Sequence, residues 1–478
     1  MSATAPSTVQ SPTAAELADL LRRQQAHRPV VRATTAAQRK DKLGRLLAYL
    51  DRADRREALV NALHADLRKH EVETLTSELG LIYSHVNHIR AHLGRWMEPR
   101  RVATPLSLLG TRSYIVHEPK GSALIIAPWN YPLNLAVIPL VYAVAAGCTV
   151  VLKPSELSPA TTAFIAELVA AVFPEEEAAV VTGDGETAAA LTALPFDHIF
   201  FTGSPAIGKK VMAAAARNLT SVTLELGGKS PCVVDGSRNI ETSAANLAWG
   251  KFFNGGQTCI APDYLLVHES VADRYVAALG RAITDFYGED PRASADLARI
   301  VHDRHFDRLV DLLDDARRRG ATIVHGGRHD RAVRYLEPTI VTGVTTEMKL
   351  LREEIFGPVL PVVTYRELDE AIDFINRLPK ALSFYVQSDR RATVRRLLAG
   401  SSSGGVVVND FLIGGSNPAL PFGGVNNSGI GKGFGHHGFL DFTNERSVIE
   451  RRFGDLSIAY PPYTERITEL ARRLYKRL

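Results

Sequence analysis

The chain has 478 residues, more than one hydrophobic core holds, and this length predicts two or three domains. Hydrophobic residues make up 45% and charged residues 23%, as in ordinary globular proteins. The net charge of +4, from 56 basic and 52 acidic residues, does not indicate a polyanionic partner, so we expect no nucleic acid. Three cysteines cannot make a disulfide framework, which predicts reduced thiols and a cytoplasmic location.

Membrane insertion is not predicted either. No apolar run reaches the length of about 18 residues that a spanning helix needs. Residues 1–12 lack both the basic and the apolar region of a signal peptide. We therefore expect no integral membrane segment.

From Ala14 to about Arg101 the sequence has the pattern of amphipathic helices. Apolar residues recur at spacings of three and four, as in the run Leu43, Leu46, Leu47 and Leu50. We interpret these helices as packing elements. Residues 104–120 then read as an extended strand.

Strands alternate with helices in the next part of the chain, which predicts a doubly wound parallel sheet. The predicted strands are 122–127, 149–152, 179–181, 198–201 and 222–224, and the predicted helices are 133–146, 160–172 and 206–217. A second alternation, from about Ser230 to Val408, predicts a second domain of this kind. The glycine-rich segment Gly414–Gly438 is expected to return the chain to the first domain.

Two short segments carry the residues for covalent attack on a carbonyl. Glu225 stands in Glu225-Leu226-Gly227-Gly228-Lys229, and Cys259 follows 34 positions later in Phe253-Asn254-Gly255-Gly256-Gln257-Thr258-Cys259. A thiol is the most nucleophilic side chain near neutral pH, and a carboxylate can accept a proton from thiol or water. Each segment alone is weak evidence, because a lone cysteine is more often a buried hydrophobe and a lone glutamate a turn residue. Together they predict attack by Cys259 and hydrolysis assisted by Glu225.

These segments resemble the aldehyde dehydrogenase superfamily, and the continuation to Tyr264 (Cys-Ile-Ala-Pro-Asp-Tyr) is similar to its class 3 branch, which oxidises fatty and aromatic aldehydes. The resemblance covers about residues 15 to 463. It implies an α/β aldehyde dehydrogenase-like fold with two doubly wound parallel-sheet domains, a small β oligomerisation element and a homodimer. The implied division is 1–103 for the N-terminal helices of the cofactor-binding domain, 104–120 for an oligomerisation strand, 121–226 for the NAD(P)-binding Rossmann-like domain, 227–410 for the catalytic domain, 411–460 for the return segment with an oligomerisation strand, and 461–478 for a C-terminal amphipathic helix.

The resemblance also implies where NAD, or alternatively NADP, binds. The turn Thr202-Gly203-Ser204 with Gly208 opens a helix, where backbone N–H groups and the helix dipole favour a pyrophosphate. It lacks the GxGxxG fingerprint of ordinary Rossmann folds, and the family binds its cofactor in this divergent way. The remaining cofactor residues are implied in two further segments, namely Lys153 and Glu156 for the adenosine ribose, Glu354 for the nicotinamide ribose and Phe356 beside its ring. Glu156 would repel a 2′-phosphate, which favours NAD.

Asn130, in Pro128-Trp129-Asn130-Tyr131-Pro132, completes the implied catalytic set. In the family it donates to the substrate oxygen together with the backbone N–H of the nucleophile, here Cys259. Cys259 would attack the aldehyde, hydride would leave to the nicotinamide, and Glu225 would activate the water that hydrolyses the thioester.

Other reactive residues are interpreted as structural. Cys148 and Cys232 lie in apolar surroundings without a neighbouring base. His302, His305 and the pair His436-His437 read as surface residues, because no further ligands stand at zinc-site spacing, and we predict no metal.

Three features leave alternatives open. Asn426 and the run Gly433-Phe434-Gly435 depart from the family pattern around the substrate mouth. A coenzyme A-acylating enzyme and an inactive binding relative are rival functions. Glu225 argues against the first, because the acylating branch typically lacks this glutamate, and the joint retention of Cys259, Glu225, Asn130, Lys153 and Glu354 argues against the second. Beyond Pro461-Pro462, an amphipathic helix is predicted. Its apolar face is Ile467, Leu470, Leu474 and Leu478, and its basic face is Arg466, Arg472, Arg473, Lys476 and Arg477. Such a helix packs on its own protein, caps the substrate mouth, or touches an anionic membrane from outside.

Overall fold

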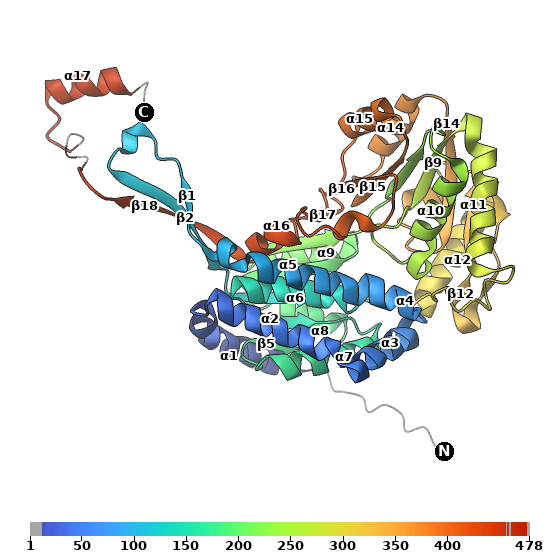
Figure 1. Cartoon of the computed structure of the whole chain (residues 1–478), viewed down its shortest axis with the longest axis horizontal. Coiled ribbons are helices and arrows are strands. Elements are labelled where there is room, and N and C mark those ends of the chain that lie inside the picture. The colour runs from blue at the N-terminus through green and yellow to red at the C-terminus, as the bar shows by residue number, and fades with distance from the viewer. Residues whose placement is uncertain (1–11, 456, 458–459, 476–478) are drawn as a thin grey trace, which may run out of the picture.

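The computed structural model describes residues 12–455, 457 and 460–475. Figure 1 shows two α/β bodies side by side and an arm that projects from the first of them. Each body is built on one predominantly parallel sheet. The predicted fold class, two parallel-sheet units with a small β element, is confirmed.

Helices occupy most of the N-terminal part. They are α1 (Ala14–Arg32), α2 (Ala36–Asp51), α3 (Ala53–Leu67), α4 (Glu71–Thr74), the π-helical turn Leu75–Leu79 and α5 (Gly80–Met97). Thr13 and Thr35 begin α1 and α2 with capping boxes, which satisfy the free N–H groups of the first turns. The leucines of α2 that were expected to form a core face are buried.

The sheet of the first body has six strands in the order β17-β7-β6-β3-β4-β5. Its strands are β3 (Ser122–Ile126), β4 (Thr149–Lys153), β5 (Ala178–Val180), β6 (His198–Gly203), β7 (Ser221–Leu226) and β17 (Gly429–Ile430), and its helices are α6 (Asn134–Ala146), α7 (Pro159–Val172), α8 (Gly185–Thr192) and α9 (Pro205–Ala216). All pairs are parallel except β17 with β7. Alternate residues of β3 face different cores, Ala123 and Ile125 toward α2, α5, α6 and α7, and Leu124 and Ile126 toward α1, α8 and α9.

The second body holds a seven-stranded sheet in the order β10-β13-β14-β9-β8-β15-β16. Its strands are β8 (Pro231–Val234), β9 (Tyr264–His268), β10 (Thr322–His325), β13 (Thr339–Thr342), β14 (Val359–Tyr365), β15 (Ser383–Gln387) and β16 (Gly405–Val408). On one face lie α10 (Ile240–Phe252) and α11 (Ala272–Tyr287), and on the other α12 (Asp303–Arg318), α13 (Lys349–Arg352), α14 (Leu368–Arg377) and α15 (Arg391–Gly400). As predicted, the chain then returns to the first body, where α16 (Gly435–Asp441) contacts α5 and α6.

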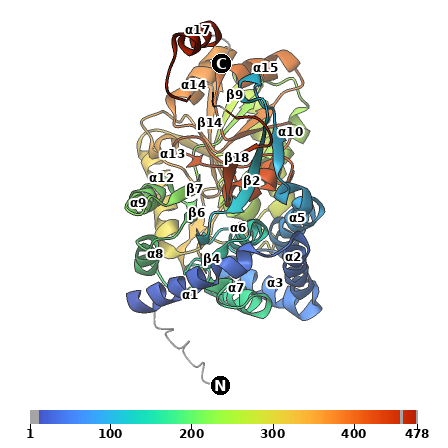
Figure 2. The same cartoon turned by 90° about the vertical axis from the view of Figure 1, so that its left-hand side faces the viewer.

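The arm is a three-stranded antiparallel sheet of β1 (Arg100–Val102), β2 (Thr111–Pro119) and β18 (Thr443–Arg451). Figures 1 and 2 show it leaving the first body next to α5. The expectation that helix continues to Arg101 is wrong, because Arg100–Val102 pairs with β2. Three residues are too few to show a periodicity, and they gain their hydrogen bonds only from a distant strand. Within 104–120, the strand begins at Thr111, after a 3-10 turn at Leu106–Leu108.

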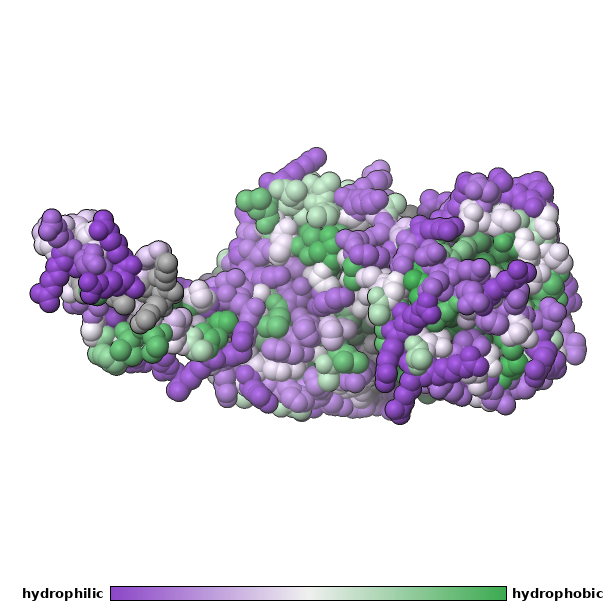
Figure 3. Space-filling model, turned by 90° about the horizontal axis from the view of Figure 1, so that it is seen from above, coloured by the Kyte–Doolittle hydropathy of each residue, from purple (hydrophilic) through white to green (hydrophobic). Residues whose placement is uncertain are grey.

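A C-terminal helix, α17 (Glu465–Leu474), lies near the tip of the arm and away from both bodies (Figure 1). The predicted basic residues Arg466, Arg472 and Arg473 are exposed on it, and Figure 3 shows mostly hydrophilic side chains at this end of the molecule. Lys476, Arg477 and Leu478 lie outside the described residues. The interpretation that this helix packs on the body of its own chain is therefore wrong for the described part. No helix in the described ranges is long and apolar enough to cross a bilayer.

Candidate functional site

A cavity of about 250 Å³ lies between the two bodies, where Cys259 of the second body meets Thr202 and Glu225 of the first. Most of its wall is apolar, formed by Leu81, Leu135, Pro139, Phe200, Trp249, Phe253, Ile260, Leu382, Leu412, Ile413, Phe422 and Phe434. Small-molecule sites commonly combine such a wall with a few convergent polar groups. The cavity therefore suits an uncharged organic molecule with one reactive polar end.

The backbone before Cys259 is bent by three consecutive residues with positive φ, Asn254 at 53°, Gly255 at 62° and Gly256 at 73°. The Asn254 side chain stabilises the bend by donating from Nδ2 to the carbonyl oxygen of Gln257 at 3.2 Å. Cys259 follows on the loop into β9 and is half-buried. Burial, and then the carboxylates Glu354 and Glu225, raise the pKa of the Cys259 thiol to about 12. The resting nucleophile is therefore the neutral thiol.

Glu225 lies inside β7, one residue before the end of the strand and two before Gly227. Its side chain is 6% exposed, and both carboxylate oxygens lack a hydrogen-bond partner among the described residues. Burial raises the pKa of Glu225 well above its usual range, while the ammonium of Lys432 acts in the opposite direction. Thr202 stands beside Glu225 in the parallel register of β6 and β7 and lines the same cavity. A buried carboxyl without a partner is costly and is typical of a functional site.

Asn130 is buried in the loop after β3 and is not part of the cavity wall. Its Nδ2 donates to the carbonyl oxygen of Gln257 at 3.0 Å, so the amide faces the loop two residues before Cys259. The next residue, Tyr131, shares a hydrogen bond of 2.6 Å with Thr258 through their hydroxyl oxygens. The structure thus brings the three predicted catalytic residues, Asn130, Glu225 and Cys259, to one place.

The predicted cofactor residues Lys153, Glu156 and 202–204 follow the carboxyl ends of β4 and β6 in the first sheet, where open α/β sheets bind ligands. Lys153 ends β4, is 3% exposed, and its ammonium bonds the Glu156 carboxylate at 2.6 Å. A donor and an acceptor side by side match the paired hydroxyls of a ribose. The alternative of a solvated surface pair does not suit Lys153, because its side chain is buried.

The turn Thr202-Gly203-Ser204 leads from β6 into the 12-residue helix α9. The first N–H groups of a helix have no partner within it and can bind an anion. Ser204 is the N-cap residue, and its hydroxyl accepts from the N–H of Ile207 at 3.4 Å. Gly208 is required for close packing, because a Cβ there would lie 2.7 Å from a methyl group of Leu226. The helix N-terminus therefore sits close to the sheet and suits a pyrophosphate.

Glu354 and Phe356 lie on the loop between α13 and β14, and the Glu354 carboxylate packs against Gly227, where a Cβ would be 2.2 Å from its oxygen. Burial raises the pKa of Glu354 to about 8. Phe356 has a φ of 53°, and its ring contacts the ring of Trp129 with 5.4 Å between centroids. Glu354 and Phe356 lie between the two bodies, on the side where the parallel strands of the first sheet have their carboxyl ends.

Sequence reasoning missed two residues that hold this loop. On α12, His305 Nε2 lies 2.8 Å from the carbonyl oxygen of Phe356, and Arg308 donates to the carbonyl oxygen of Glu354 at 3.0 Å. The interpretation of His305 as a surface residue is wrong, because its ring is half-buried between Trp129 and Phe356. His302 caps the start of α12. A local pattern gave no signal, since the contacts span about 50 residues.

A buried ion pair between Lys229 and Asp263 was also missed. Lys229 bonds the Asp263 carboxylate and the carbonyl oxygens of Leu350, at 2.7 Å, and Glu353, at 2.9 Å. Asp263 accepts from the N–H of Ile355 at 2.8 Å. The pair therefore joins the loops that carry Glu225, Cys259 and Glu354. A signal was available, because both residues stand in the quoted motifs at the same 34-residue spacing.

The other predicted structural residues lie away from the cavity. Cys148 is buried and its thiol donates to the carbonyl oxygen of Phe442, and Cys232 is fully buried in β8. Burial raises the pKa of the Cys148 thiol to about 11. His436 and His437 are exposed. Within the described residues, no three histidine, cysteine or acidic side chains are grouped for a metal ion.

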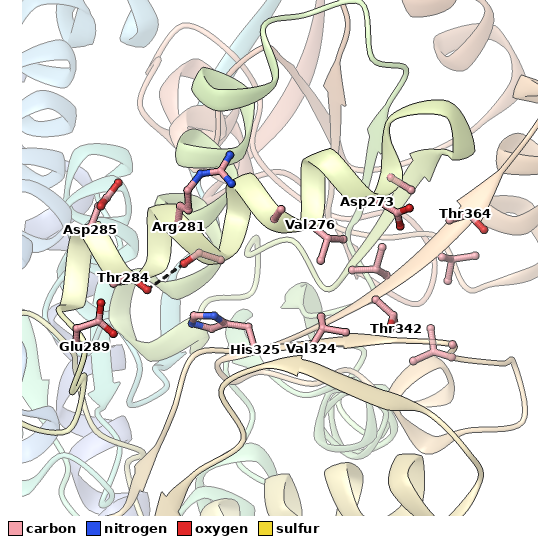
Figure 4. Close-up of a pocket in the computed structure, with 17 residues that line it drawn as sticks. Asp273, Val276, Arg281, Thr284, Asp285, Glu289, Val324, His325, Thr342 and Thr364 are labelled. Carbon is pink, nitrogen blue, oxygen red and sulfur yellow. Dashed lines mark hydrogen bonds between the residues drawn. The ribbon is translucent and has the colours of Figure 1, made fainter.

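A larger groove of about 970 Å³ lies between α11 and the strands β10, β13 and β14 (Figure 4). Its polar residues include Asp273, Arg281 and His325, and Arg281 is already paired with Glu241 at 2.9 Å. None of the residues lining it is a cysteine or one of the predicted site residues. It is not the candidate site.

Comparison with known proteins gives consistent matches. The model of the aldehyde dehydrogenase family matches residues 2–448. The chain is 44% identical over 406 residues to 4,4'-diaponeurosporen-aldehyde dehydrogenase of Staphylococcus aureus, covering 85% of this chain and 88% of that protein. It is 44% identical over 416 residues to aldehyde dehydrogenase family 3 member B1 of Rattus norvegicus, covering 86% and 88%. The solved substrate-bound structure of Staphylococcus aureus AldH superimposes with a TM-score of 0.90 at 40% identity, covering 95% of this chain and 99% of that one.

Proposed function

Because the chain belongs to the class 3 branch of the aldehyde dehydrogenase family, we propose that Cys259, Asn130 and Glu225 carry out its reaction. That reaction is the NAD(P)-dependent oxidation of an aldehyde to a carboxylic acid. The observation that supports the assignment is the shared cavity, where a half-buried thiol and a buried carboxyl without a partner face one apolar space.

The first step makes a carbon–sulfur bond. The Cys259 thiol attacks the carbonyl carbon, its proton leaves to Glu225 or water, and the carbonyl oxygen becomes an oxyanion. The Asn130 amide and the N–H of Cys259 donate to that oxygen, and such a donor contributes roughly 10²–10³ in rate. NAD(P)⁺, when bound, would supply the acceptor for the hydride of the former aldehyde carbon, and Cys259 would then hold the acyl group as a thioester.

Glu225 acts in the second step. Its carboxylate accepts a proton from water, the hydroxide adds to the thioester, and the carbon–sulfur bond breaks to release the acid and the thiol. A buried carboxyl of raised pKa suits this role, because it retains a proton more strongly than an exposed carboxylate. Burial raises the pKa of both Cys259 and Glu225, because the apolar wall disfavours the charged form of each.

The cofactor residues are proposed from the fit of their chemistry. Lys153 and Glu156 would bind the adenosine ribose hydroxyls, the α9 N-terminus at Ser204 the pyrophosphate, and Glu354 the nicotinamide ribose. The carboxylate of Glu156 beside the 2′ position favours NAD over NADP.

The substrate proposed from the cavity is an apolar aldehyde, aliphatic or aromatic. A charged aldehyde would lose its hydration on binding, and the apolar side chains of the wall offer no opposite charge in return. Burying each methylene group contributes about 0.8 kcal/mol, so affinity should rise with chain length until the cavity is filled.

A homodimer is proposed from the arm. Four large apolar side chains on and beside its strands are between 60% and 88% exposed, namely Leu106, Leu109, Ile449 and Phe453. Such a group of exposed apolar side chains is typical of an interaction surface. In the second body, β16 is an edge strand with Val406 and Val408 exposed. Two copies that pair the arm of one with the β16 edge of the other would cover both surfaces, as edge strands require. The oligomerisation strands would then lie in the segments 104–120 and 411–460. The cofactor-binding domain would comprise residues 1–103 and 121–226, and the catalytic domain residues 227–410. The free thiols support a cytoplasmic location.

NADH absorbance in a panel of hexanal, decanal, benzaldehyde and coniferyl aldehyde tests the proposal. We expect Cys259→Ala to abolish turnover while NAD binding persists, and Cys148→Ala and Cys232→Ala to stay active. Turnover by Cys259→Ala beyond a trace would contradict the mechanism. Turnover that depends on added coenzyme A would instead favour the acylating alternative.

A further inference from the structure

A buried ion pair lies behind the catalytic loops. Lys69, just after α3, bonds the Glu78 carboxylate of the π-helical turn with 2.9 Å between Nζ and Oε1, and both side chains are 0% exposed. Burying two charges costs more than their attraction returns unless further hydrogen bonds are made. The further bonds of this pair are therefore informative.

The remaining contacts of Lys69 are with the loop of Asn130. Its ammonium donates to the Asn130 carbonyl oxygen at 3.2 Å and lies 4.2 Å from the centroid of the Tyr131 ring. Asn130 and Tyr131 both bond the loop before Cys259, through Gln257 and Thr258. One ammonium thus contacts two of the residues that link the first body to the nucleophile loop.

The acidic side of the pair is tied to the same loops. The second oxygen of Glu78 accepts from the N–H of Asn134 at 2.8 Å, beyond the Asn130 loop. One turn earlier, Glu73 accepts from the N–H of Asn254 at 3.2 Å, at the bend of the nucleophile loop. Thr76 and Ser77, between them, line the cavity. π-helical turns occur frequently at functional sites, and this one borders the cavity on one side and the ion pair on the other.

We propose that Lys69, held by Glu78, is a positioning residue that fixes the Asn130 donor against the nucleophile loop so that the oxyanion is bound as it forms. The inference rests on the proposed function, because it acts through Asn130 and Cys259. Lys69 itself does not line the cavity and does not touch the substrate.

The expected effect is on the chemical step. Loss of the ammonium frees the Asn130 carbonyl oxygen from one of its two donors, leaving only Asn254 Nδ2 at 2.9 Å. A misplacement of about 1 Å in a catalytic group can cost roughly 10²-fold in rate. The KM for NAD should be unaffected, since the cofactor residues lie on other loops.

The experiment separates positioning from stability. Lys69→Met alone leaves the Glu78 charge unpaired and is expected to destabilise the fold, whereas the double variant Lys69→Met with Glu78→Gln leaves no unpaired charge. We expect the double variant to unfold within a few degrees of the wild type. Its NADH burst rate, per Cys259 titrated with iodoacetamide, should fall about 10-fold to 100-fold with an unchanged KM for NAD.

A matched control is the half-buried pair of Lys42 and Glu177, which joins α2 to the first sheet away from the cavity. Lys42→Met with Glu177→Gln should keep the wild-type burst rate. A wild-type burst rate in the Lys69/Glu78 double variant would overturn the proposal and leave a purely structural pair.

If the double variant does not fold, Lys69→Arg is tested instead. This variant keeps the positive charge but replaces the compact ammonium by a planar guanidinium. We expect that variant to fold with a burst rate lowered at least about threefold, and an unchanged rate would overturn the proposal. The wild type provides the separate check, because the absence of any Cys259-dependent NADH formation would refute the proposed function and not this inference alone.

Discussion

Replacing Glu225 by glutamine changes three measurable properties, and the structure predicts the direction of each. The first is thioester hydrolysis, which should slow by roughly 10²–10⁴, the usual contribution of a positioned base. Acylation should continue, so a burst of NADH should persist before the slow steady state. Stopped-flow absorbance measures both phases in one experiment.

The second property is the reactivity of Cys259. The charge of Glu225 raises the thiol pKa, so its removal should lower that pKa and speed alkylation by iodoacetamide. At a pKa of about 12, only about 1 thiol in 10⁴ is ionised at pH 8, and each unit of decrease gives about tenfold faster alkylation. Alkylation rates of wild type and variant between pH 6 and 10 test this.

The third property is stability. The folded-state pKa of Glu225 lies above its unfolded value of about 4.5, so its contribution is fully present below that pH and is lost as pH rises through the folded pKa. Each unit of difference corresponds to about 1.4 kcal/mol, and glutamine does not ionise. The variant should therefore unfold at a higher temperature than wild type in alkaline buffer, with the difference shrinking toward pH 4.

The opposite outcome would refute this reasoning. If Glu225 activates the thiol in the resting enzyme, the variant should show no burst and slower alkylation. That result would place Glu225 in the attack step and contradict its assignment to thioester hydrolysis. Glu225→Gln with a normal steady state would exclude it as the base altogether.

Three further predictions follow from the same structure. Burial raises the pKa of Glu73 to about 7, so Glu73→Gln should stabilise the fold above pH 7 and not near pH 4. Thermal unfolding between pH 4 and pH 8 measures this, and an equal change in Tm at both ends of the range would contradict the prediction. Glu156→Gln should raise the ratio of kcat/KM for NADP to that for NAD about fivefold to tenfold, because one charge beside the 2′-phosphate is removed, and an unchanged ratio would exclude Glu156 from the ribose site. Because α17 lies away from both bodies, truncation after Tyr463 should leave the KM values for short and long aldehydes unchanged and should reduce binding to anionic liposomes. A shifted KM for long aldehydes with unchanged liposome binding would instead favour a cap on the substrate mouth.

Residues close in sequence were predicted well, because periodicity and turn chemistry are local. The strands and helices around Asn130 and Glu225 end within a few residues of their predicted positions, since a buried parallel strand needs an unbroken apolar run. The strand of the arm was found in the right segment. Its partner β1 was not, because Arg100–Val102 becomes a strand only through pairing with residues more than ten positions away.

The site shows the same division. The chemical types in two short motifs indicated Cys259 as nucleophile and Glu225 as base, and the resemblance they carried added Asn130. Those motifs do not show the surroundings that set the pKa values of Cys259 and Glu225. Glu225 lacks a hydrogen-bond partner in the described part of the chain, and Cys259 is half-buried, because both lie where the two bodies meet.

By itself, then, the sequence determined the reaction class and the alternation of elements, because both depend on residue identity at short spacing. Only the tertiary structure decided which distant groups hold the catalytic loops. Lys69 with Glu78, and Lys229 with Asp263, are ordinary charged residues in the sequence, and they become buried ion pairs because folding removes water from both partners at once. The energy of such a pair depends on its surroundings in three dimensions, and no local pattern records it.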